Sequence, residues 1–234
     1  MKCIILNSGM GTRLGDLTAN NPKSLVYLSE NETILSKAIN ILSKFDFDEF
    51  IITTGYLDNI LKDYIVKTFP DLSFSFVHNS IYDKTNYIKS LDLVPDLNDD
   101  IVLLHGDLVF DEKTAGYVIG SNDSCVVVDS SIDIPKDDFK AKIVENNVKY
   151  IGVDYFEDDA IACQPFYYLK NEDWKIWKNK IREFCDSGNN NVYAENALNT
   201  LTDEIIIKAI DIKGRLCMEI DTKEDLAKVM EILQ

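Results

Sequence analysis

The N-terminal stretch Cys3-Ile4-Ile5-Leu6-Asn7-Ser8-Gly9-Met10-Gly11-Thr12-Arg13-Leu14 decides the fold. Residues 3–6 form a short continuous apolar run, which is typical of a strand buried on both faces of a parallel sheet. The loop that follows holds two glycines, and glycine lets the backbone turn tightly and approach a ligand closely. The stretch therefore predicts a buried strand that ends in a glycine-rich loop.

The same alternation continues along the first half of the chain. Apolar runs typical of strands occupy residues 50–53, 74–77 and 101–104, and apolar residues at helical spacing occupy 34–45, 57–69 and 87–94. Short buried strands alternating with helices indicate a doubly wound α/β fold with a mostly parallel, Rossmann-like sheet. Ligands bind at the carboxyl ends of the strands in such sheets, so the site is expected after Leu6, Val77 and Leu104.

The second half is less regular. Residues 142–144 and 148–151 flank Asn146-Asn147 and predict a β-hairpin. The remaining pattern predicts helices at 174–184, 191–201 and 223–233 and strands at 205–207 and around Met218. We expect the hairpin and the 174–184 helix to form an insertion that walls the acceptor side of a cleft. No linker interrupts the chain, which favours a single domain over residues 1–234.

The composition excludes several classes of protein. Acidic residues number 40 and basic residues 24, and the net charge of −16 disfavours binding to nucleic acid and to anionic membranes. No apolar run approaches the roughly 20 residues of a membrane helix, and we expect a cytoplasmic protein. The five cysteines form no CxxC pair and the two histidines have no metal-ligand spacing, so neither disulfides nor zinc are expected.

The glycine loop is by itself an ambiguous signal. Leu14 stands where a dinucleotide-binding loop needs its third glycine, and the P-loop pattern GxxxxGK[ST] is absent. The backbone N–H groups of such a loop can wrap a triphosphate, although an ordinary tight turn is the alternative. Arg13 and the Pro22-Lys23 pair add two cations, which suit a polyphosphate; a solvated surface lysine is the other interpretation of Lys23.

Carboxylates follow two of the expected strands. Asp107 follows Gly106 at the end of the 101–104 strand, and Glu219 and Asp221 share one face of an extended segment. Oxygen ligands of this kind suit Mg²⁺ bound to phosphate oxygens. The alternatives are a turn or N-cap role for Asp107 and a cap of the last helix for Asp221 or Thr222.

Together these motifs resemble the nucleotidyltransferase family with the sugar-nucleotide pyrophosphorylase fold. The resemblance spans nearly the whole chain, and it departs from the family at Asn7-Ser8, where two alanines are usual. It implies that the loop Asn7, Ser8, Gly9, Met10, Gly11 and Thr12, with Gly106, binds a nucleoside triphosphate. It also implies that Arg13, Lys23 and Asp107 are catalytic and that Asp107, Asp221 and Glu219 hold Mg²⁺.

The length and the Glu219-Ile220-Asp221 ending resemble small bacterial cytidylyltransferases that make CDP-choline and related CMP-activated compounds. The segment 79–91 resembles their base-recognition segment, which makes Asn79, Thr85, Asn86 and Ser90 candidates for base contacts; an ordinary loop and helix start is the alternative. Gln164, Tyr193 and Glu195 are candidates for acceptor binding, although Tyr193 also suits a core position.

The expected function is a CTP-dependent transfer of CMP to a small phosphorylated or phosphonate metabolite of the phosphocholine, 2-aminoethylphosphonate or phosphoglutamine type. A sugar-1-phosphate uridylyl- or thymidylyltransferase and a non-catalytic nucleotide-binding regulatory protein are the alternatives. The expected partners are CTP and a small anionic phospho-metabolite, and the sequence leaves open whether the chain forms a homodimer.

Overall fold

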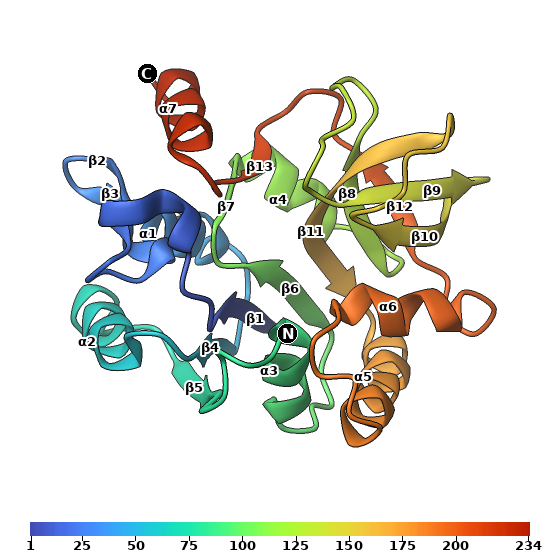
Figure 1. Cartoon of the computed structure of the whole chain (residues 1–234), viewed down its shortest axis with the longest axis horizontal. Coiled ribbons are helices and arrows are strands. Elements are labelled where there is room, and N and C mark those ends of the chain that lie inside the picture. The colour runs from blue at the N-terminus through green and yellow to red at the C-terminus, as the bar shows by residue number, and fades with distance from the viewer.

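Alternate side chains of the first strand, β1 (Lys2–Asn7), pack into two separate cores in this computed structural model, which describes residues 1–234. Ile4 and Leu6 belong to one core, whereas Cys3 and Ile5 belong to the other. Burial on both faces explains why the run 3–6 is continuously apolar. The predicted doubly wound α/β fold is confirmed, with helices on both sides of the sheet (Figure 1).

The central sheet has nine strands in the order β5-β4-β1-β6-β11-β8-β12-β10-β9. Its first four strands run parallel, and β12 runs parallel to β8. The long strand β11 runs antiparallel to both β6 and β8, and the β9–β10 hairpin closes the far edge. The strands introduced here are β4 (Glu49–Thr54), β5 (Phe74–His78), β6 (Ile101–His105), β8 (Cys125–Asp129), β9 (Lys140–Val144), β10 (Asn147–Gly152), β11 (Ala160–Leu169) and β12 (Lys208–Asp211).

Three helices cover each face of this sheet. One face carries α3 (Tyr87–Leu93), α5 (Asn171–Asp186) and α6 (Ala194–Leu198), which contribute both tryptophans to the core. The other face carries α1 (Ile34–Leu42), α2 (Asp58–Thr68) and α4 (Glu112–Ile119). None of these helices combines the length and the hydrophobicity that a membrane span requires.

Two short two-stranded sheets flank the main sheet. The strand β13 (Cys217–Glu219) pairs with β7 (Leu108–Phe110), and β2 (Tyr27–Ser29) pairs with β3 (Glu32–Thr33). The last helix, α7 (Lys223–Ile232), packs through Val229 into a third, smaller core. Short 3-10 segments complete the chain: η1 (Thr12–Leu17), η2 (Lys23–Leu25) and η3 (Asn199–Leu201).

The predicted hairpin is confirmed, with its turn one residue earlier than expected. Glu145 and Asn146 occupy the two turn positions with φ of 50° and 64°, so Asn147 is already the first residue of β10. Positive φ at both positions is the backbone conformation that a two-residue hairpin of this twist requires. The helix expected at 191–201 is present as α6 followed by η3.

One strand prediction in the second half was wrong, and the long strand β11 was not predicted. Residues 205–207 form no strand, and β12 begins only at Lys208. Ile205 and Ile207 are apolar because they are buried in the core as part of a connecting segment. The strand β11 was not predicted, because Pro165 interrupts its apolar run. A register shift between Gln164 and Tyr167 accommodates that proline in the middle of the sheet.

Candidate active site

A pocket of about 430 Å³ opens at the carboxyl ends of β1, β5 and β6, the edge predicted from the sequence. Its volume lies within the usual range of ligand-binding pockets. Twenty residues line it, and only three are hydrophobic. They are Leu6, Asn7, Ser8, Gly9, Gly11, Thr12, Arg13, Lys23, Ser24, Asn79, Tyr82, Thr85, Asn86, Tyr87, Ser90, His105, Gly106, Asp107, Asn191 and Asp221.

The three glycines around the pocket differ in how strictly their position requires a residue without a side chain. Gly11 has a φ of +62°, and a Cβ there would lie 2.7 Å from the Cβ of Lys23, so no other residue fits without displacing the lysine. A Cβ on Gly106 would lie 2.1 Å from the Oδ1 of Asn7. Gly9 has open space around it, and Met10 is exposed and lies outside the pocket lining.

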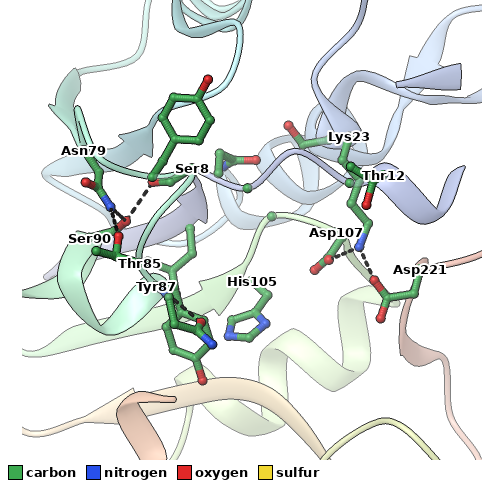
Figure 2. A pocket seen from close by; sticks show the side chains of 18 of the residues that line it. Ser8, Thr12, Lys23, Asn79, Thr85, Tyr87, Ser90, His105, Asp107 and Asp221 are labelled. Atoms are coloured by element: carbon green, nitrogen blue, oxygen red, sulfur yellow. Dashed lines mark hydrogen bonds and ion pairs between the residues drawn. The ribbon is translucent and has the colours of Figure 1, made fainter. Parts of the chain in front are cut away.

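Lys23 joins the two carboxylates that the sequence assigns to a metal site. Its Nζ contacts Asp107 Oδ2 and Asp221 Oδ1, and Arg13 contacts Asp221 Oδ2 at 2.8 Å. Figure 2 shows the lysine between the two aspartates. Burial opposes the charge on Lys23, but the two carboxylates outweigh burial and raise its pKa. Residues separated by 198 positions therefore meet in one electrostatic cluster.

The two-stranded sheet of β7 and β13 brings Glu219 and Asp221 close to Asp107. Leu108 of β7 pairs with Glu219 of β13, and the backbone N–H of Ile220 donates to the carbonyl of Asp107 at 3.0 Å. Thr222 then caps α7, and Asp225 accepts hydrogen bonds from the backbone N–H groups of Asp221 and Thr222. The helix-cap interpretation of Thr222 is correct, and the cap also holds Asp221 in place.

Two residues next to the predicted carboxylates, His105 and Asp138, escaped the sequence analysis. His105 Nδ1 lies 2.8 Å from Glu219 Oε1, and the ring packs edge-on against Tyr87 with the centroids 4.7 Å apart. Asp138 forms a compact carboxylate group with Glu219 and Asp221. Burial and the charge of Asp107 raise the pKa of Glu219 to about 7, although the contact with His105 acts in the opposite direction. Only the position of His105 at the end of β6 could have drawn attention to it.

The four residues assigned to base contacts line the other end of the pocket. Asn79 Nδ2 lies 3.1 Å from both Thr85 Oγ1 and Ser90 Oγ, and Ser90 Oγ donates to Ser8 Oγ at 2.9 Å. Asn86 caps α3 by accepting a hydrogen bond from the N–H of Tyr87. The side chains of Ser8, Asn79, Thr85 and Ser90 thus form one hydrogen-bonded polar surface, seen at the left of Figure 2.

The three residues assigned to the acceptor do not line this pocket. Glu195 is 2% exposed, and its two carboxylate oxygens accept hydrogen bonds from Tyr87 and Tyr167. Tyr193 is half-buried against Phe139, with the ring centroids 5.1 Å apart. Gln164 is buried in β11 with an unpaired Oε1. Their role in acceptor binding stays a prediction.

The donor set fits a divalent cation. Asp107 Oδ1 is buried and has no hydrogen-bond partner, and the ligand atoms of His105, Asp107 and Glu219 lie within 4.8 Å of one another. An unpaired carboxylate oxygen beside other carboxylates is the environment that a hard cation such as Mg²⁺ prefers.

Comparison with known proteins identifies the family. Residues 2–120 match the sequence profile described as nucleotidyl transferase. The chain belongs to the nucleotidyl transferase family. This nucleotidyltransferase is 28% identical to the CTP:phosphoglutamine cytidylyltransferase of Campylobacter jejuni, over 99% of this chain and 100% of that protein.

Two further comparisons agree with this assignment. The choline-phosphate cytidylyltransferase of Streptococcus pneumoniae is 26% identical to this nucleotidyltransferase, over 100% of this chain and 99% of that protein. The solved structure of the CTP:phosphocholine cytidylyltransferase from Streptococcus pneumoniae superposes with a TM-score of 0.80 at 23% identity, covering 100% of this chain and 99% of that chain. This superposition shows a shared fold.

Proposed function

We propose that this nucleotidyltransferase is a CTP-dependent cytidylyltransferase that transfers CMP to a small phosphorylated or phosphonate metabolite and releases pyrophosphate. The observation that carries the proposal is the cluster in which Lys23 and Arg13 meet Asp107 and Asp221 beside a glycine loop. The full-length similarity to cytidylyltransferases supports CTP as the nucleotide.

In the proposed reaction an oxygen of the acceptor phosphate attacks the α-phosphorus of CTP. A new oxygen–phosphorus bond forms, the bond from the α-phosphorus to the bridging oxygen breaks, and pyrophosphate leaves with that oxygen. The acceptor oxygen is already anionic, so no side chain has to remove a proton. Catalysis then consists of alignment and charge neutralisation.

The residues of the chain divide this task. The backbone of the loop from Asn7 to Thr12 with Gly106 faces the phosphates, and Lys23 and Arg13 neutralise their charge. Asp107, Asp221 and Glu219 would hold Mg²⁺, which would supply further positive charge at the phosphate oxygens. When phosphates enter, Lys23 has an alternative partner to the two aspartates that it contacts here.

The charge around the site supports an acceptor that carries nitrogen as a cation. Four carboxylates, Asp107, Asp138, Glu219 and Asp221, face only two permanent cations, Arg13 and Lys23. The ring of Tyr193 packs against Phe139, whose ring centroid lies 6.3 Å from that of His105. An ammonium group is stabilised by both carboxylates and aromatic faces. Acceptors of the phosphocholine, 2-aminoethylphosphonate or phosphoglutamine type fit this environment.

A cytoplasmic location is part of the proposal. All five cysteines are free and buried, as expected for thiols in a reducing compartment.

The test is pyrophosphate release measured with each nucleoside triphosphate against a panel of acceptors, in the presence of Mg²⁺ and again after chelation with EDTA. We expect turnover with CTP and an amine-bearing phosphate or phosphonate, and loss of turnover in EDTA. Activity confined to UTP or dTTP with a hexose phosphate would contradict the proposal. Nucleotide binding without any turnover would instead indicate a regulatory protein.

A further inference from the structure

The hydroxyl groups at the base end of the pocket form a hydrogen-bond chain with a fixed direction. The direction starts at Asn79, whose Oδ1 accepts from the backbone N–H of Ile81 at 3.1 Å. A backbone N–H can only donate, so the amide oxygen of Asn79 must face it. The Nδ2 of Asn79 must then face the other way, where it donates to Thr85 Oγ1 and to Ser90 Oγ.

The three hydroxyls that line the pocket, those of Thr85, Ser90 and Ser8, each donate their single hydrogen to an acceptor of the protein. Thr85 Oγ1 donates to the carbonyl oxygen of Ile81 at 3.0 Å. Ser90 Oγ donates to Ser8 Oγ at 2.9 Å, and Ser8 Oγ donates to Thr53 Oγ1 at 3.0 Å. Thr53 Oγ1 receives a second donor, the backbone N–H of Asn7, at 3.0 Å. Thr53 is fully buried and lies behind the lining.

These hydroxyls can therefore still accept hydrogen bonds from a ligand, but they have no hydrogen left to donate. A hydroxyl has one hydrogen and two acceptor positions. Thr85, Ser90 and Ser8 have each used the hydrogen and one acceptor position within the chain, so each can offer a ligand only an acceptor. A ligand group that donates hydrogen bonds is stabilised at this surface, whereas a carbonyl oxygen meets lone pairs and loses its partner.

We propose that this chain of hydroxyls selects cytosine over uracil, with Thr53 as a positioning residue that sets the direction from behind the pocket. Cytosine presents an exocyclic amine, a donor, where uracil presents a carbonyl oxygen, an acceptor. The inference rests on the proposed function: phosphates bound at the cluster around Lys23 would place the base at the hydroxyls, which lie at the opposite end of the pocket (Figure 2).

The first measurement is nucleotide binding by titration calorimetry without any acceptor. The probes are CTP, UTP and the triphosphate of the 2-pyrimidinone riboside, which carries no exocyclic group. We expect CTP to bind tightest, the 2-pyrimidinone nucleotide next and UTP weakest, with CTP favoured over UTP at least about tenfold. Comparison with the 2-pyrimidinone nucleotide shows how much of the preference comes from binding the amine of cytosine and how much from excluding the carbonyl of uracil. Equal binding of CTP and UTP would overturn the inference.

Two variants each remove the acceptor of one hydroxyl, so that this hydroxyl can donate a hydrogen bond to a ligand in the pocket. Thr53→Val keeps the shape of the buried side chain but removes the acceptor of Ser8, so the Ser8 hydrogen is free to meet a uracil carbonyl. Ser8→Ala removes the acceptor of Ser90 and frees the Ser90 hydrogen in the same way. We expect the CTP-to-UTP affinity ratio to fall by about tenfold in each variant. The gain for UTP is a change that mere loss of structure does not produce.

Ser124→Ala is the matched control. Ser124 is a buried serine that accepts from the N–H of Lys170 and donates to Asp173, far from the lining of the pocket. We expect it to lower stability without changing the ratio. If wild type prefers CTP and both variants keep the wild-type ratio, the selectivity arises elsewhere and the inference fails. Calorimetry needs no acceptor, so absence of pyrophosphate release in the acceptor panel contradicts the proposed function separately.

Discussion

The ammonium of Lys23 lies between Asp107 and Asp221 and offsets the repulsion between their two carboxylates. The same carboxylates are the proposed ligands of Mg²⁺, so the lysine and the metal compete for them in the absence of nucleotide. Once a triphosphate is bound, its oxygens provide a second partner for the lysine. At the scale of single residues, the central feature of the proposed site is thus that Lys23 can change its ion-pair partner from carboxylates to phosphate oxygens.

Replacing Lys23 by Met separates the effect of the lysine on metal binding from its effect on turnover. We expect the nucleotide-free variant to bind Mn²⁺ at least about fivefold more tightly, because the ammonium no longer occupies the carboxylates. Turnover should fall at the same time, because the triphosphate loses a cation. Calorimetry with Mn²⁺ measures the first effect, and pyrophosphate release measures the second. Lys37→Met, which removes a lysine paired with Glu32 outside the pocket, serves as control. Weaker Mn²⁺ binding in the Lys23 variant would refute the competition.

Asp107→Ala removes the carboxylate whose Oδ1 has no partner in the protein. We expect the rate of Mg²⁺-dependent turnover to fall by about 10²–10³-fold, a loss comparable to removal of one charge-stabilising group in other enzymes. The fold should persist, because Lys23 keeps Asp221 as a partner. Circular dichroism checks the fold, and Asp123→Ala, on the exposed surface, is the control. Near-normal turnover in the Asp107 variant would show that the metal assignment is wrong.

At the scale of elements, the N-terminus of α7 positions a site residue. The carboxylate of Asp225 accepts from Thr222 Oγ1 and from the N–H groups of Thr222 and Asp221, so the capping box also holds the backbone of the site residue Asp221. Asp221 in turn contacts both Lys23 and Arg13. Loss of the cap should therefore affect the chemistry as well as the stability.

We expect Asp225→Ala to cost about 1 kcal/mol of stability, as helix caps usually do. We expect kcat/KM to fall by about tenfold or more, because a displaced Asp221 misaligns Lys23 and Arg13. Urea unfolding and steady-state kinetics measure the two effects. The matched variant is Asp111→Ala, which removes the N-cap of α4. If both variants lose the same stability and keep the same activity, the cap of α7 has no role in the site.

At the scale of the whole molecule, the net charge of −16 sets the background against which the site works. Like charges on a folded protein repel one another and destabilise the compact state. Salt screens this repulsion, since the Debye length falls from about 30 Å at 0.01 M to about 10 Å at 0.1 M ionic strength. Within this acidic surface, Arg13 and Lys23 are paired with Asp107 and Asp221 at the pocket.

We therefore expect the melting temperature to rise by about 2–4 °C between 0.01 M and 0.3 M NaCl, equivalent to roughly 1 kcal/mol for a chain of this size. Differential scanning calorimetry measures the shift, and sucrose at equal osmolality controls for solvent exclusion. A melting temperature that falls with salt would mean that attractive ion pairs outweigh the repulsion.

The sequence by itself determined the first half of the fold and located the loop, Lys23 and Asp107 that line one pocket. Continuous apolar runs such as 3–6 mark strands buried on both faces, and the loop from Asn7 to Arg13 follows the first of them directly. These features are local, because burial period and glycine geometry depend on neighbouring residues. Lys23 and Asp107 were identified for the same reason, since each follows a recognisable local pattern.

Tertiary structure alone decided the features that depend on pairing between distant residues. Strand β11 became visible only in the sheet, where a register shift accommodates Pro165 between two neighbours. Asp138 and His105 joined the site only through folding, and Glu195 was shown to be covered by two tyrosines. The direction of the Asn79 hydrogen-bond chain also required coordinates, because a hydroxyl can donate or accept until its neighbours are known.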